Sequence, residues 1–200
     1  MSRVGSAVGL RLAGVAGIAG GLGWSARAVL TFAADRGASV LGYGTLDLLV
    51  PVALALAVVG VVGHYARTQV AWSGVTTAGF VAFFAGLLGT FAGSAAYAVG
   101  GLLTGWTLSV WSYFLALVGA VGFGAGLLRD EVPPRSGAVL LTVALPAGLT
   151  VSLALAVGGV VPDEAVVPVG PGVLLGAGIA ALGWWGWNET ERPKNSRFRR

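Results

Sequence analysis

Six long apolar stretches occupy most of the 200-residue chain, and they constrain its fold more than any other feature. Helices of about 20 apolar residues cross the hydrocarbon core of a bilayer, where each segment must satisfy its own backbone polar groups. The stretches therefore predict an all-α fold, a bundle of six transmembrane helices in one domain over residues 1–187, followed by a short tail over 188–200. The predicted spans are 8–30, 47–66, 74–101, 107–128, 137–161 and 169–187.

The composition agrees with a lipid surrounding. Apolar residues make up 56% of the chain and charged residues only 10%. A soluble domain carries about 25% charged residues, so this chain cannot cover a surface that faces water. We expect an integral protein of the cell membrane.

The distribution of charge predicts the orientation. If the chain crosses six times, all of its 12 cations except Arg27 and Arg36 fall on one side. Cytoplasmic loops carry an excess of Lys and Arg, so that side is predicted to be cytoplasmic, with both termini there. One alternative stays open: the first stretch also suits a signal peptide with a cleavage site near Ala26-Arg27-Ala28, and cleavage would leave five helices.

The C-terminal tail is basic. Cations near an anionic leaflet gain about 1 kcal/mol each, so we expect these side chains to face the inner leaflet of the bilayer, and we expect no nucleic-acid partner. The cations are Arg192, Lys194, Arg197, Arg199 and Arg200.

Glycine accounts for 34 residues, and small residues recur at every fourth position from Gly5 to Gly21. Such a row lets another helix approach closely. It predicts tight packing between helices, and association with a second copy of the chain or with other membrane subunits.

The sequence shows no pattern typical of a catalytic or cofactor site. There is no cysteine and a single histidine, which excludes thiolate metal sites and bis-histidine haem within one chain. We expect no catalytic, cofactor or metal site. His64 lies beside Tyr65 and Arg67 and is interpreted as an interfacial residue, with a proton site as the alternative.

Two groups of polar residues are candidates for a site. Thr90, Ser94 and Tyr97 share one helical face, and with Ser109, Ser112 and Tyr113 they can line a vestibule open to the outside. The alternative is that these hydroxyls bond to the backbone or across a tight helix pair. Arg27 and Asp47 flank the first outer linker and are predicted to form a salt bridge there.

These observations favour a non-catalytic structural or interaction component of a membrane complex. The alternative is an uncoupled transporter or channel for a small neutral solute, which would use the polar vestibule. A cavity that reaches towards the middle of the membrane beside Thr90, Ser94 and Tyr97 favours the alternative, and a filled interior favours the structural role.

Overall fold

The computed structural model of the chain describes residues 3–38, 41–159 and 166–189, and the side chains in these ranges except at 3–7, 35 and 166–168. The predicted lipid-facing tail, with Arg192, Lys194, Arg197, Arg199 and Arg200, lies outside the described residues. The described residues form six α-helices and one short 3₁₀ helix, and no strand. The helices are α1 (Arg3–Asp35), α2 (Tyr43–Thr68), η1 (Gln69–Ala71), α3 (Gly74–Gly100), α4 (Leu103–Arg129), α5 (Arg135–Val157) and α6 (Val166–Glu189).

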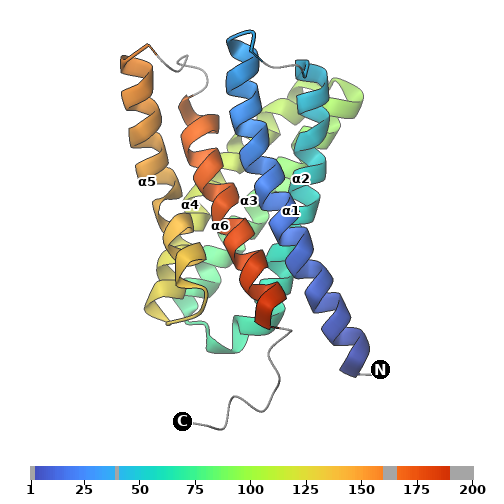
Figure 1. Ribbon diagram of the computed structural model, residues 1–200, viewed down its shortest axis with the longest axis vertical. Coiled ribbons are helices and arrows are strands. Elements are labelled where there is room, and N and C mark those ends of the chain that lie inside the picture. Colours follow the sequence, from blue (N-terminus) through green and yellow to red (C-terminus); the bar gives the residue numbers. More distant parts are fainter. Residues whose placement is uncertain (1–2, 39–40, 160–165, 190–200) are drawn as a thin grey trace.

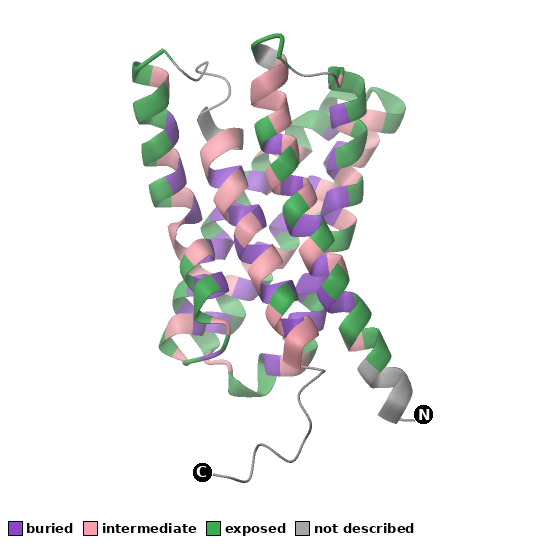
Figure 2. Ribbon diagram, viewed as in Figure 1, coloured by how far each residue is buried: buried purple, intermediate pink, exposed green. Residues whose placement is uncertain are grey.

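All six α-helices are long and apolar enough to cross a membrane, which confirms the predicted helical class and six helices of spanning length. Their outer faces are apolar as well: Val81, Val118 and Val151 are each more than half exposed. Figure 2 shows the buried residues on the faces that turn towards neighbouring helices. An apolar outer surface of this kind suits lipid as the surrounding solvent.

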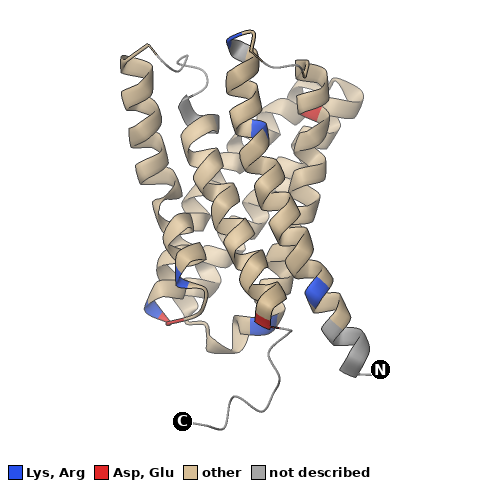
Figure 3. Ribbon diagram, in the orientation of Figure 1, with Lys and Arg blue, Asp and Glu red and all other residues tan. Residues whose placement is uncertain are grey.

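Successive helices run in opposite directions and pack side by side, and α6 returns to contact both α1 and α2 (Figure 1). Helix α1 therefore begins, and helix α6 ends, at the same end of the bundle. We call this the basic end, because Arg67, Arg129 and Arg135 lie at the helix ends there (Figure 3). The opposite end, where α1 ends and α2 begins, is called the cavity end for the hollow described below.

The glycine row of α1 packs mainly against helices of the same chain. A Cβ at Gly17 would lie 3.1 Å from the Cα of Gly60 on α2 and 3.1 Å from the Cα of Gly183 on α6. Only small residues allow backbones to approach so closely. At Gly9, by contrast, an added Cβ meets nothing within 4 Å. The row therefore serves the fold of one chain, and association with a second chain stays a prediction.

A tight hairpin joins α3 and α4. Gly101 ends α3 in the left-handed conformation, with φ of 65°, which glycine adopts without steric cost. Along the pair, a Cβ at Gly93 would lie 2.5 Å from the backbone nitrogen of Ser109. These contacts hold the polar face of α3 against the start of α4 and so build one wall of the cavity.

Helix α2 begins earlier than the sequence suggested, at Tyr43 instead of after Asp47. Asp47 is therefore a helical residue, and Pro51 lies inside the helix, beyond its first turn. Proline has no N–H, so the carbonyl of Asp47, four residues earlier, cannot receive the usual helical hydrogen bond. Helix α5, in comparison, continues on both sides of Pro146.

Candidate functional site

A cavity of about 450 Å³ lies at the cavity end between α1, α2, α3 and α4. Five of the six residues of the predicted vestibule line it, and Arg27 and Asp47 line it too. The two groups that the sequence suggested separately thus belong to one site. Small-molecule pockets have volumes of about 300–1,000 Å³, so this cavity suits a small ligand. The five vestibule residues are Thr90, Ser94, Tyr97, Ser109 and Tyr113.

Ser112 is the exception. It does not line the cavity, because it packs against α3, where a Cβ at Gly89 would lie 2.8 Å from the Ser112 Cβ. Its hydroxyl therefore belongs to the α3–α4 interface. This corrects the assignment of Ser112 to the vestibule.

The cavity extends well into the bundle. About 15 Å of helix separates Thr90 from the end of α3 at Gly100, and about 15 Å separates the start of α4 at Leu103 from Tyr113. Near the helix ends the lining is exposed, with Tyr97 at 38% and Trp106 at 51%. Deeper in the bundle, Thr90 and Tyr113 are buried. The lining therefore runs from an exposed aromatic rim to a buried floor.

The rest of the lining was not suggested by the sequence and consists of Trp24, Val50, Trp106, Val110 and Phe114. Trp24 packs on Tyr113 with ring centroids 5.5 Å apart, so α1 and α4 meet at the floor. No local pattern identifies these residues, because apolar and aromatic side chains are common throughout the chain. Only the packing of four helices distinguishes them.

The hydroxyls of α3 make hydrogen bonds within their own helix. Thr90 donates to the carbonyl of Gly86 at 2.7 Å, and Ser94 donates to that of Phe91 at 3.0 Å. Both side chains nonetheless line the cavity. These hydroxyls can therefore bond to the backbone and still serve the vestibule, because a hydroxyl that donates one hydrogen bond keeps lone pairs for accepting another.

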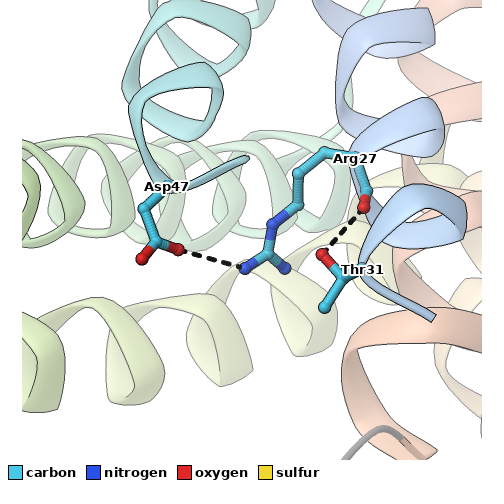
Figure 4. A network of polar contacts seen from close by, with 3 residues as sticks. All are labelled: Arg27, Thr31 and Asp47. Carbon is cyan, nitrogen blue, oxygen red and sulfur yellow. Dashed lines mark hydrogen bonds and ion pairs between the residues drawn. The ribbon is translucent and has the colours of Figure 1, made fainter. Parts of the chain in front are cut away.

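Arg27 reaches from α1 towards Asp47 on α2, and the closest nitrogen–oxygen distance is 4.0 Å (Figure 4). The two side chains are 20% and 38% exposed. The hydroxyl of Thr31 donates to the carbonyl of Arg27 at 2.9 Å, one turn further along α1. A partly exposed pair at this separation contributes only about 0–1 kcal/mol to stability. What distinguishes the pair is its place in the wall of the cavity.

At the basic end, aromatic side chains fill the space between α2, α3 and α4. Ring centroids are 4.9 Å apart for Tyr65 and Phe80, 5.0 Å for Trp72 and Phe80, and 5.2 Å for Trp72 and Phe123. We call this group, with His64 and Trp185, the aromatic cluster. The aromatic cluster lies between α2, α3 and α4 at the basic end, whereas the cavity lies between the same helices at the opposite end.

His64 lies within the aromatic cluster and is only 3% exposed. Its ring meets Trp185 and Phe123 edge-on, at 5.6 and 6.2 Å between centroids. Neither ring nitrogen has a hydrogen-bond partner among the described residues. The side chain is thus buried among rings near the end of α2, and its depth in a membrane stays a prediction.

Asp130, in the turn after α4, binds the start of α3. Its carboxylate accepts a hydrogen bond from the backbone N–H of Ser73 at 2.6 Å and another from the hydroxyl of Thr76. These bonds, that of Thr76 first, hold the pKa of Asp130 below its usual value. Sequence reasoning missed this contact, because the residues are far apart in the chain.

A second hollow, of about 460 Å³, lies between α1, α6 and the start of α5. Ile18, Leu22 and Trp184 are among the side chains that line it, and Glu189 is the one charged residue in the lining. It brings together no pair of opposite charges. Among the described residues, no group of three or more His, Cys, Asp or Glu is placed to hold a metal ion.

Comparison with known proteins gives no match, neither to a family model nor to a curated protein or a solved structure. Inference about function therefore depends on the site itself. Its chemistry consists of a small cavity with an aromatic rim, hydroxyls along one wall and two opposite charges near its mouth.

Proposed function

We propose that this chain is a multi-pass membrane protein that binds a small, net-neutral polar solute in the cavity and lets it cross the membrane without a coupling ion. The observation that carries the proposal is the cavity beside Thr90, Ser94 and Tyr97, which extends from the cavity end towards the middle of the bundle. A purely structural bundle has no need of such a hollow. The proposed role is non-catalytic.

The two ends of the bundle support a gated passage. The cavity is accessible past the exposed rings of Tyr97 and Trp106, whereas the aromatic cluster fills the space between α2, α3 and α4 at the basic end. The structure thus corresponds to a state open at one end. Passage of a solute requires the aromatic cluster to repack.

The absence of a coupling ion follows from the charges near the cavity. Transporters driven by protons or sodium ions use acidic residues at membrane depth. Among the described residues that line the cavity, Asp47 is the only acid, and it faces Arg27. With Arg27 beside it, this carboxylate gives the cavity no net negative charge to attract a lone coupling cation.

The proposed location is the cell membrane, with the basic end and both termini in the cytoplasm and the basic tail on the anionic leaflet. The positive-inside distribution of Arg67, Arg129 and Arg135 supports this orientation. Reporter fusions to each terminus test it. Reporters active only outside the cell would overturn the orientation.

Cysteine labelling tests whether the cavity is open to water. The chain has no cysteine, so each introduced thiol reports on one position. We expect Ser94→Cys and Ser109→Cys to react with a membrane-impermeant maleimide added to intact cells. Ser152→Cys is the matched control, because Ser152 is buried and does not line the cavity. Lack of labelling at both cavity positions would contradict an outward-facing cavity.

Light scattering from proteoliposomes tests passage. Vesicles that contain the protein are expected to reswell in glycerol or urea faster than protein-free vesicles. Maleimide bound to Ser109→Cys should slow the reswelling, whereas the same reagent should leave the wild-type protein unchanged. Equal rates with and without the protein would exclude passive transport of such solutes.

A structural or interaction role in a membrane complex is the second candidate. It is favoured by the first turns of α1, where Gly9 has open space around it and Val8 and Leu12 are 54% and 63% exposed. A helix of a second copy or of another subunit can pack there. Gly9→Leu is expected to reduce co-purification of such a partner. If the wild type and Gly9→Leu both purify as monomers without a partner, this role is contradicted.

A further inference from the structure

We propose that the solute is a small zwitterion that carries a carboxylate and an ammonium or quaternary ammonium group. Arg27 binds the carboxylate, and Asp47 with the aromatic rim binds the cation. This inference rests on the proposed function, since it names the class of solute that the same cavity takes. It depends on the placement of opposite charges, on buried polar groups at the floor and on the aromatic lining.

The first argument comes from the charges. Arg27 and Asp47 stand on different helices in the wall of the cavity, with 4.0 Å between the closest nitrogen and oxygen. A charge-assisted hydrogen bond is shorter, about 2.7–2.9 Å, so the two side chains are not held in their tightest contact. A zwitterion can supply a countercharge to each of them. An ion of one sign satisfies one side chain and is repelled by the other.

The second argument comes from the floor. Trp24 and Tyr113 are at least nine-tenths buried, and both line the cavity. Neither the indole Nε1 nor the phenolic oxygen has a hydrogen-bond partner of normal geometry among the described residues. Even if the indole donates to the Tyr113 oxygen, the hydroxyl proton still needs an acceptor. A ligand carboxylate bound by Arg27 offers such acceptors, and unsatisfied buried donors are costly.

The third argument comes from the cationic side of the site. Tyr97 and Trp106 give the cavity an aromatic rim at α3 and α4, and Phe114 adds a ring deeper in its lining. Aromatic faces attract ammonium groups, most strongly quaternary ones in aromatic cages. Pro51 also removes the helical hydrogen bond to the carbonyl of Asp47, which leaves an acceptor beside its carboxylate. The site thus favours a cation that is only partly hydrated.

The experiment compares three ligands of nearly equal shape on the full-length protein in nanodiscs by calorimetry. Glycine betaine has both charges, 3,3-dimethylbutyrate replaces its nitrogen by carbon and keeps the carboxylate, and choline keeps the cation alone. Glycine, with a primary ammonium group, shows whether the methyl groups matter. We expect at least one zwitterion to bind about tenfold tighter than both single-charge analogues.

Two variants test the charges. Arg27→Gln and Asp47→Asn are each expected to weaken zwitterion binding about tenfold or more, because the remaining charge then lacks its countercharge. Arg36→Gln is the matched control, since Arg36 is a second arginine at the same end of α1 that contacts Phe32 and does not line the cavity. The double exchange Arg27→Asp with Asp47→Arg keeps both charges and so controls for folding of the single variants. It should still bind zwitterions weakly, because the floor donors then face the cation and the aromatic rim faces the carboxylate. Full binding by this exchanged protein would contradict the assigned roles.

The outcomes separate this inference from the proposed function. If the zwitterions bind no better than the single-charge analogues, or if the Arg27→Gln and Asp47→Asn proteins fold and bind equally well, the zwitterion inference is overturned. Faster reswelling in glycerol and labelling at Ser94→Cys would leave the proposed function standing in that case. Loss of reswelling and labelling together would overturn both.

Discussion

At the cavity end, α1 to α4 enclose a hollow of about 450 Å³ with two opposite charges, whereas at the basic end three of the same helices are joined by the aromatic cluster. Rings occur at both ends. At the cavity end small and hydroxylated residues such as Thr90 and Ser94 stand among the rings and leave space, whereas at the basic end rings such as Phe80 and Phe123 pack directly on one another, with centroids 5.5 Å apart.

This difference shows how one bundle can be both stable and accessible. Close packing at one end fixes the helices relative to one another, so the other end can keep a cavity without collapse. In the proposed function the aromatic cluster is the barrier and the cavity is the binding site. Paired substitutions, one in the aromatic cluster and one in the cavity lining, therefore test the proposal.

The largest effect is expected from a pair of phenylalanines on α4. Phe123 is fully buried in the aromatic cluster, whereas Phe114 lines the cavity and is 38% exposed. Phe123→Ala should destabilise the protein by an amount near the lower end of about 3–5 kcal/mol, because it leaves a hole in a packed region. Phe114→Ala should cost much less, since a partly exposed ring leaves no closed hole. Unfolding in mixed micelles measures both, and equal losses would contradict the contrast between the two ends.

The next effect concerns transport. Val110 lines the cavity and is partly buried, so Val110→Trp should fill much of the space without disturbing the aromatic cluster. Reswelling in glycerol is expected to slow about tenfold, which corresponds to about 1.4 kcal/mol in the barrier. Val118→Trp serves as control, because Val118 is 60% exposed on the same helix and does not line the cavity. Similar slowing by both substitutions would place the passage elsewhere.

A smaller effect is expected at His64. Its ring nitrogens lack hydrogen-bond partners among the described residues, so an apolar replacement removes buried polar groups from an aromatic region. His64→Leu should leave the stability unchanged or raise it by about 1 kcal/mol, whereas His64→Asn should lower it. Marked destabilisation by His64→Leu, measured by thermal unfolding, would show that the imidazole makes a hydrogen bond essential to the barrier.

The smallest effect is expected from pH at the basic end. Hydrogen bonds from Thr76 and Ser73 lower the pKa of Asp130 in the folded protein, so this contact stabilises the fold fully above the ordinary pKa of 3.8. The stabilisation is lost as the pH falls through the lowered value, because protonation weakens the contact. The melting temperature of the wild type should therefore fall more steeply with acid than that of Asp130→Asn. Glu131→Gln is the control on the neighbouring acid, and identical slopes for wild type and Asp130→Asn would refute the contact.

Much of the fold was predictable from the sequence because its rules are local. Long apolar stretches must satisfy their backbone hydrogen bonds as helices in lipid, and this predicted the helical class and the six helices of spanning length. The periodicity of a single helix also placed Thr90, Ser94 and Tyr97 on one face, and that face lines the cavity. The start of α2 lies before the predicted span, which begins at 47, because the helix extends beyond its apolar stretch to Tyr43.

The sequence by itself therefore determined six apolar helices, their order and the faces on which polar side chains stand. Only the tertiary structure decided that Arg27 and Asp47 share a cavity with Tyr113, that Ser112 packs against α3, and that His64 lies among aromatic rings. The reason is physical. Hydrogen bonding within a helix depends on residues a few positions apart, whereas the choice of helix partners depends on many weak contacts between small apolar residues that resemble one another along the whole chain.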